Sequence, residues 1–172
     1  MSCTSYTLKG IAKDCSTSMG GIKNVYIANY SDVTKVEATA DKISGITMET
    51  GTKFLGYALR KGAASMNSTA TIDTALGINF VTTDLVFNLL KMDTAKRIEM
   101  SALLVNELAI IVEDANGVYW YLGKDEPVTA TAGTGTTGQA RTDGNMYSVT
   151  VQDTAQTFPF EVEASVVATV IS

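Results

Sequence analysis

Histidine is absent from the 172 residues of this chain, and cysteine and proline occur only twice each. Without histidine the chain lacks the commonest general base at neutral pH, and it can form neither a Ser-His-Asp nor a Cys-His arrangement. Cys3 and Cys15 give no zinc site when no histidine accompanies them. We expect reduced thiols in a protein made in a cytoplasm, and we expect no enzyme, cofactor or metal site.

Charged side chains are also scarce, at 18% of the chain, whereas hydrophobic ones make up an ordinary 45%. A low charge fraction in a chain of this size indicates that part of its surface does not face water. The net charge is −5 and no basic stripe is present, so a sequence-specific reader of nucleic acids is not expected. An acidic protein still suits DNA as a non-specific passing cargo, because a negative wall repels the phosphate backbone.

Long apolar runs are missing as well. The best one, Ala102–Val112, is interrupted by Asn106 and Glu107 and is too short to cross a membrane. The first ten residues lack the apolar core of a signal peptide. We therefore expect a soluble protein that has no membrane partner and is not exported through a cleavable signal.

The chain does contain many short apolar runs separated by Gly and Asn, which are typical of β structure. Its length fits a single domain, residues 1–172. Residues 1–21 are polar and end in two glycines, which indicates an arm, and residues 30–52 are either a long loop or a protruding hairpin. Strands are expected over 22–29, 53–60, 66–74, 78–90, 128–132, 146–152, 157–164 and 166–171, with a Gly/Thr loop over 133–139.

Only one segment, about residues 94–106, carries a convincing helical pattern. Asp93 or Thr94 can cap its first amides. An apolar stripe recurs at spacings of three and four residues, made of Ala95, Ile98, Ala102 and Val105. Strands precede and follow this helix without a βαβ rhythm. The sequence therefore predicts a mainly β fold, an antiparallel β-sandwich or barrel with one flanking α-helix.

Two of the expected strands alternate in polarity. One face of 66–74 is polar, and it is either an ordinary solvated face or the lining of a water-filled channel. Its members are Asn67, Thr69, Thr71 and Asp73. In 78–90 the apolar face changes phase near residues 82–83, which predicts a β-bulge or a crossing between sheets.

The strongest local signal is a hairpin over 108–123, where Asn116-Gly117 between two apolar runs favours a two-residue type I′ turn. The register of that turn pairs Ile111 with Leu122, Glu113 with Trp120, Val112 with Tyr121 and Asp114 with Tyr119. Both faces are apolar, so we expect the helix to cover one side and a second sheet or a neighbouring subunit to cover the other. The candidate core or interface residues, rather than a stacking platform, are Ile111, Tyr119, Trp120 and Tyr121.

Three patterns resemble chemical sites but lack the necessary context. Residues 133–138 match the glycine spacing of a dinucleotide fingerprint, yet turn residues rather than a helix follow them. Residues 143–145 lack the spaced acidic ligands of a calcium loop. The acidic pairs 113–114 and 125–126 are expected to be solvated ends of strands rather than glycosidase-like carboxylates.

Two stretches together carry a family resemblance: Leu-Val-Phe-Asn-Leu-Leu-Lys-Met-Asp-Thr-Ala-Lys-Arg (85–97) and Ile-Ile-Val-Glu-Asp-Ala-Asn-Gly-Val-Tyr-Trp-Tyr-Leu-Gly (110–123). With the helix between them, they resemble tail tube (major tail) proteins of tailed bacteriophages. Residues 137–150 and 158–162 fit the same pattern, so the resemblance covers residues 53–162. The resemblance lies in these segments taken together and not in one diagnostic motif.

The resemblance implies a β-sandwich with a flanking helix, six copies of which form a ring whose inner sheets join into one closed barrel. The rings stack into a tube with a polar, net-negative lumen for DNA. It also implies a virion tail protein that assembles in the host cytoplasm and contacts other tail proteins. Strands 66–74 and 78–89 would then belong to the barrel, and segment 30–52 and the terminal arms to contacts between rings.

Other functions stay open at this point. A head–tail connector, a stopper or a capsid decoration protein would share the composition and the self-association. A carbohydrate-binding β-sandwich is a further alternative, although the aromatic residues are concentrated in one hairpin. A β-rich enzyme is the last.

Overall fold

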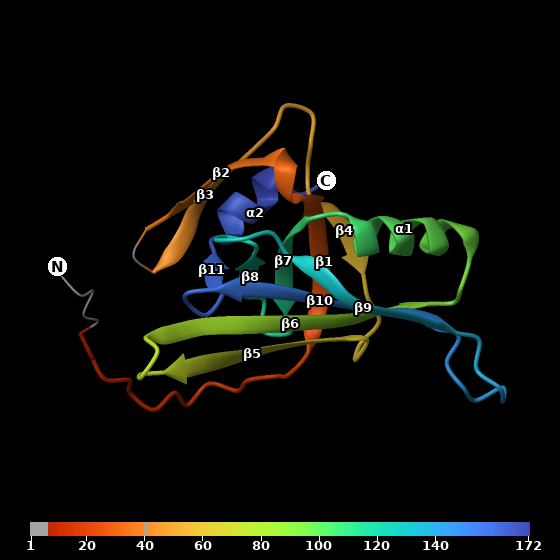
Figure 1. Ribbon diagram of the computed structural model, residues 1–172, viewed down its shortest axis with the longest axis horizontal. Helices are drawn as coiled ribbons and strands as arrows, with labels where there is room; N and C mark the ends of the chain where they lie inside the picture. Colours follow the sequence, from red (N-terminus) through yellow and green to blue (C-terminus); the bar gives the residue numbers. More distant parts are fainter. Residues whose placement is uncertain (1–6, 40) are drawn as a thin grey trace.

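The computed structural model of the chain describes residues 7–39 and 41–172, which form two packed β-sheets and two α-helices (Figure 1). The larger sheet has the strand order β2-β3-β11-β8-β7-β1-β4, and the smaller one has the order β5-β6-β10-β9. In Figure 1 the strands of the smaller sheet cross those of the larger sheet. The predicted mainly β fold, a sandwich with a flanking helix, is confirmed.

The strands of the larger sheet are β1 (Ile22–Asn29), β2 (Val33–Ala38), β3 (Lys42–Met48), β4 (Leu55–Ala58), β7 (Leu108–Asp114), β8 (Tyr119–Leu122) and β11 (Phe160–Val162). Those of the smaller sheet are β5 (Ala64–Asp73), β6 (Ile78–Leu90), β9 (Thr129–Thr136) and β10 (Met146–Ala155). The helices are α1 (Thr94–Val105), α2 (Ala164–Val170) and a short 3-10 turn, η1 (Tyr30–Asp32). Neighbouring strands pair antiparallel, except for the parallel pair β3–β11.

Strand β7 occupies the centre of the molecule, and Leu108–Val112 are all buried. Ile110 and Val112 point into a core between the two sheets, where they meet Leu85, Phe87 and other apolar residues of the smaller sheet. The alternate residues Ala109 and Ile111 point into a second core. Both faces of the predicted hairpin are therefore covered by this chain itself, one by the smaller sheet and the other by α2 and its surroundings.

The C-terminal segment forms helix α2, so the strand predicted over 166–171 is wrong. The N–H groups of Val166 and Val167 donate to Glu163 O, and Ile171 N–H donates to Val167 O. Val167 and Val170, three residues apart, pack on the larger sheet. A short run of β-branched residues does not distinguish a buried helix from a strand. Residues 7–39 and 41–172 thus contain two α-helices, and α2 rather than α1 covers the outer face of the hairpin.

Helix α1 lies where the sequence predicts, and Asp93 caps it by accepting the N–H of Lys96 at 2.8 Å. The predicted apolar stripe is wrong, however. Met100 and Leu103 are the buried residues, whereas the side chains of Ile98 and Val105 are 56% and 83% exposed. Helix α1 packs only against the first core. Only a narrow strip of the helix surface, around Met100 and Leu103, is therefore buried.

The predicted loop over 133–139 is mostly strand, because β9 continues to Thr136. Glycine suits this strand because other side chains approach its backbone closely. A Cβ atom at Gly133 would lie 2.8 Å from Leu104 Cδ2 of helix α1, and one at Gly135 would lie 3.0 Å from the ring of Tyr147. The glycines therefore mark close packing within a strand rather than a flexible loop.

Strand β6 pairs in unbroken register with both β5 and β10, so the bulge or crossing predicted near residues 82–83 is wrong. Val81, Thr83, Leu85 and Phe87 all point inward. The buried Thr83 hydroxyl is satisfied by Ser68 Oγ at 2.8 Å. The apparent change of phase arises because a polar residue occupies one inward position, while Phe80 lies on the outer face.

The turn between β7 and β8 has three residues, 115–117, rather than the predicted two. Glu113 pairs with Tyr119, Val112 with Trp120 and Ile111 with Tyr121, one residue away from the predicted register. Gly117 has a φ of 81°, whereas Asn116 does not have a positive φ, and a type I′ turn requires positive φ at both central residues. The Asp114 side chain fixes the longer turn, because its Oδ1 accepts the N–H groups of Asn116 and Val118 at 2.8 and 3.0 Å.

Two segments lie at the periphery of the molecule: the β2–β3 hairpin at the edge of the larger sheet, and the N-terminal arm. Residues 30–52 contain η1 and the hairpin β2–β3, and this hairpin joins the larger sheet through β11. The arm runs beneath β5 in Figure 1, and its residues 7–20 are exposed. Asn116 anchors the end of the arm, because its side chain bonds both the N–H and the carbonyl of Met19 at 2.9 and 3.1 Å.

We expect Asp114→Ala to lower the free energy of unfolding by about 1–2 kcal/mol, because two backbone N–H groups and the indole of Trp120 lose an acceptor. Urea unfolding followed by the fluorescence of the single tryptophan measures this change. The control Asp114→Asn keeps an oxygen that can accept the two backbone N–H groups and loses only the acceptor of the Trp120 indole, so it should lose less stability than Asp114→Ala. Equal losses in the two variants would contradict the role of the turn.

Candidate functional site

The outer face of the smaller sheet gathers polar side chains from all four strands. The register places Asn67 opposite Asp84 and Thr69 opposite Thr82, and β10 and β9 continue the same face. Apolar residues such as Phe80 and Val86 are a minority on it. The polar members are Ser65, Asn67, Thr69, Thr71 and Asp73 of β5, Thr82, Asp84 and Asn88 of β6, Ser148, Thr150, Gln152 and Thr154 of β10, and Thr134 and Thr136 of β9.

The charge of this sheet has one sign. Strands β5, β6, β9 and β10 contain no lysine or arginine, and their carboxylates on the polar face are Asp73 and Asp84. Gln152 Nε2 donates to Asp84 Oδ1 at 2.9 Å. A face of hydroxyl and amide groups with carboxylates but no cation hydrogen-bonds water and repels phosphate.

The four residues predicted to line a channel lie together on this face. Asn67, Thr69 and Thr71 are exposed. Asp73 stands at the end of β5, where its Oδ1 accepts the N–H groups of Ala75 and Leu76 at 2.9 and 3.1 Å. Asp73 therefore also holds the β5–β6 turn.

Sequence reasoning missed the contributions of β6, β9 and β10 to this face. The alternation of Ser148, Thr150, Gln152 and Thr154 could have revealed the share of β10, but strand pairing across the chain was needed to join it to β5.

The predicted core or interface residues lie elsewhere, inside the larger sheet. Ile111 and Tyr121 are buried in the second core, where the ring of Tyr121 meets Phe54 edge-on at a centroid distance of 6.5 Å. Tyr119 lies at the border of the same core. Trp120 packs against the first core, and its indole N–H donates to Asp114 Oδ2 at 3.1 Å. These aromatic side chains contribute to both cores rather than to a common platform.

The sequence predicts that Glu113 is a solvated strand end, but this prediction is wrong, because the residue is 95% buried. Its carboxylate accepts hydrogen bonds from Asn24 Nδ2 at 2.7 Å and from Lys23 Nζ at 3.2 Å. The hydrogen bond and charge of Glu113 hold the pKa of Lys23 above its ordinary value. These bonds tie the start of β1 to the end of β7.

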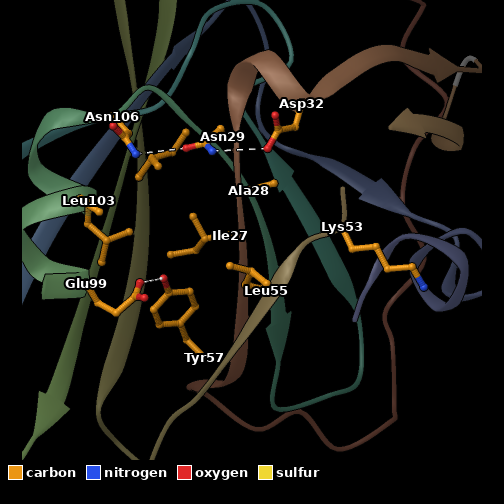
Figure 2. Close-up of a pocket in the computed structure, with 12 residues that line it drawn as sticks. Ile27, Ala28, Asn29, Asp32, Lys53, Leu55, Tyr57, Glu99, Leu103 and Asn106 are labelled. Atoms are coloured by element: carbon orange, nitrogen blue, oxygen red, sulfur yellow. Dashed lines mark hydrogen bonds between the residues drawn. The ribbon is translucent and has the colours of Figure 1, made fainter. Parts of the chain in front are cut away.

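A pocket of about 220 Å³ lies between α1 and strands β1 and β4 (Figure 2). Figure 2 shows Tyr57 Oη donating to Glu99 Oε2 at 2.7 Å, and Asn106 Nδ2 donating to Asn29 Oδ1 at 3.2 Å. Burial and the adjacent Glu99 raise the pKa of Tyr57, so the phenol remains a donor. These bonds fasten the middle and the C-terminal end of α1 to the larger sheet.

Asp153 is a buried carboxyl group on the inner side of β10, 4% exposed. Neither its Oδ1 nor the buried Tyr121 Oη has a hydrogen-bond partner among the described residues. Burial raises the pKa of Asp153 to about 6, and the nearby Asp125 and Glu126 add to this effect. The backbone N–H groups of Gly123 and Thr154 oppose it. Ionisation of this carboxyl group therefore destabilises the folded sandwich.

We expect the stability contributed by Asp153 to be full below about pH 4 and to fall as the pH rises through 6, because its folded pKa lies above that of the unfolded chain. Asp153→Asn should therefore be more stable than the parent protein by about 2–3 kcal/mol at pH 8, with little difference near pH 4. Urea unfolding between pH 4 and 8 measures the difference. The exposed Asp41→Asn is the control, and a parallel pH profile for parent and Asp153→Asn would contradict this account.

No helix among the described residues is long and apolar enough to span a membrane. Within residues 7–39 and 41–172, no group of three or more His, Cys, Asp or Glu residues is placed to hold a metal ion. Comparisons of the chain with protein-family models, curated proteins and solved structures give no match.

Proposed function

We propose that this protein is a tail tube subunit of a bacteriophage virion, which assembles into stacked rings, six copies to a ring, around a channel for DNA. The observation that supports this proposal best is the outer face of the smaller sheet. It combines hydroxyl and amide groups from four strands with two carboxylates and no lysine or arginine. Such a surface stays hydrated and does not bind a phosphate backbone.

The open edges of the same sheet support the proposal further. Strands β5 and β9 are the outer strands of the sheet, so one side of each has backbone groups that no other described strand pairs. Exposed edges of this kind invite pairing with another chain. Pairing β5 of one copy with β9 of the next would continue the sheet around a ring and close it without a free edge. The polar face would then become the inner wall.

The cores support a subunit that folds before it assembles. Both faces of β7 are covered within the chain, so ring formation need not complete a core. Large apolar side chains that remain exposed lie on the arm, on α1, at the tip of the β5–β6 hairpin, and at Leu55 and Phe158. Contacts between copies would use the sheet edges and some of these exposed side chains.

Negative-stain electron microscopy of the purified protein tests the proposal. We expect rings with a central opening and, at higher protein concentration, stacked tubes. Analytical ultracentrifugation of the same samples should show association that depends on concentration. A particle that stays monomeric at every concentration would contradict a tube subunit.

A lysine on the polar face tests where that face lies in the assembly. Thr69→Lys should make assembled tubes retain DNA at least about tenfold better than tubes of the parent protein at low salt, and added salt should abolish the effect. Thr69 is preferable to Asp73, whose side chain holds the turn. Filter retention of labelled DNA measures the binding.

The matched control is Ser101→Lys on the exposed surface of α1. In the proposed tube, the lysine of Thr69→Lys faces the channel and that of Ser101→Lys does not. Only the former can therefore hold DNA that is enclosed during assembly. We expect DNA that is assembled into the tubes to resist nuclease digestion in Thr69→Lys and not in Ser101→Lys. Equal protection in the two variants would place the polar face outside the channel.

A further inference from the structure

The tip of the β5–β6 hairpin is apolar and uncovered. Ile72, Leu76 and Ile78 are 66%, 74% and 38% exposed. Strand β10 ends opposite Val81, so the residues beyond this point pair only with one another. A two-stranded ribbon is marginally stable by itself in water. The tip therefore gains most from a partner that covers its three large side chains.

A groove suited to such a tip lies at the start of the same hairpin. It encloses about 610 Å³, and its wall is mostly apolar. Ile22 and Leu59 contribute to the wall, together with the backbone of glycines that leave it open. Lys23 and Lys61 also line the groove. The complete lining is Met19, Gly20, Gly21, Ile22, Lys23, Leu59, Lys61, Gly62 and Ala115.

The charges of the tip and the groove are complementary. The tip carries the carboxylate of Asp73, and no lysine or arginine occurs in β5, in β6 or in the turn between them. At the groove, Lys61 has no ion pair among the described residues, whereas Lys23 is bonded to Glu113. A carboxylate beside Lys61 would be favoured over a second cation.

A chain cannot place its own tip in its own groove. The groove includes Lys61 and Gly62, just before β5, and the tip follows the other end of β5, ten residues later. Those residues span about 33 Å when extended, and Figure 1 shows the two ends of the hairpin well apart. A second copy that is shifted along the hairpin by about this length would bring its tip to the groove.

We propose that the tip around Leu76 of one copy inserts into the groove beside Lys61 of a second copy. The two surfaces differ, so the contact is heterologous and every copy keeps one free tip or one free groove for the next. This inference rests on the proposed function, since in a tube it is the contact between successive rings. It makes the stack directional, with tips at one end and grooves at the other.

Paired cysteines test the contact. Both native cysteines are first replaced by serine, and Leu76→Cys and Lys61→Cys are then introduced together. Mild oxidation at assembling concentration should give a ladder of dimers, trimers and longer species on non-reducing gels. Either cysteine alone should give dimers at most, because a ladder needs two different reactive ends on every copy.

Each outcome decides between the two proposals. A ladder from a sample with stacked tubes supports both, and stacked tubes without a ladder would overturn the tip contact and leave the tube in place. A ladder without rings or tubes supports the contact and contradicts the tube, and the absence of both contradicts both. A ladder from Ile11→Cys with Lys61→Cys, in place of the tip pair, would assign the groove to the arm and overturn the proposal.

A charge on the tip provides a second measurement. Leu76→Glu should raise the protein concentration needed for tube formation by about tenfold or more, because a buried leucine contributes more than the free energy of a tenfold change. Light scattering and electron microscopy measure that concentration. The matched control is Val105→Glu on α1, where the replaced residue is also mostly exposed, 83% against 74% for Leu76. An equal effect of both variants would overturn a contact specific to the tip.

Discussion

The fold depends on the burial of β7 on both of its faces. Leu108–Val112 are at most 2% exposed, and alternate side chains of a strand point to opposite sides. The chain must therefore build two cores, one against the smaller sheet and one against α2. The crossing of the two sheets and the position of the C-terminal helix follow from this requirement, and the aromatic residues of β8 serve one core or the other.

Sequence patterns predicted the elements whose signals are local. The strands of the smaller sheet, helix α1 and the β7–β8 hairpin were found because alternation, a capping aspartate and a turn between two apolar runs are visible in neighbouring residues. The hairpin register was missed because the Asp114 side chain, rather than the Asn-Gly pair alone, selects the turn. Helix α2 and the glycine-containing part of β9 were missed because their surroundings decide them: a sheet to cover in one case, and Leu104 in close contact in the other.

The polar face could be predicted only in part, for a similar reason. Alternation within β5 marks Asn67, Thr69 and Thr71 as members of one face, but a single strand does not reveal the area of the face. Its size depends on pairing between residues about 55 to 75 positions apart along the chain, such as Asp84 with Gln152. Burial of Glu113 and Asp153 was equally hidden, because their neighbours come from distant strands.

Strand β10 ends opposite Val81, so the outermost part of the β5–β6 hairpin has no third described strand beside it. This has a consequence for when that part of the hairpin becomes ordered. The ribbon beyond Val81 adds little to the stability of the isolated chain, because no third strand among the described residues pairs with it. In the proposed assembly, the ribbon would become ordered only when a partner is present, and subunits would accumulate before they polymerise. The start of growth in that assembly would then depend on the first complex that offers a complementary surface to the ribbon, so a small number of initiating complexes would set when and where tubes form.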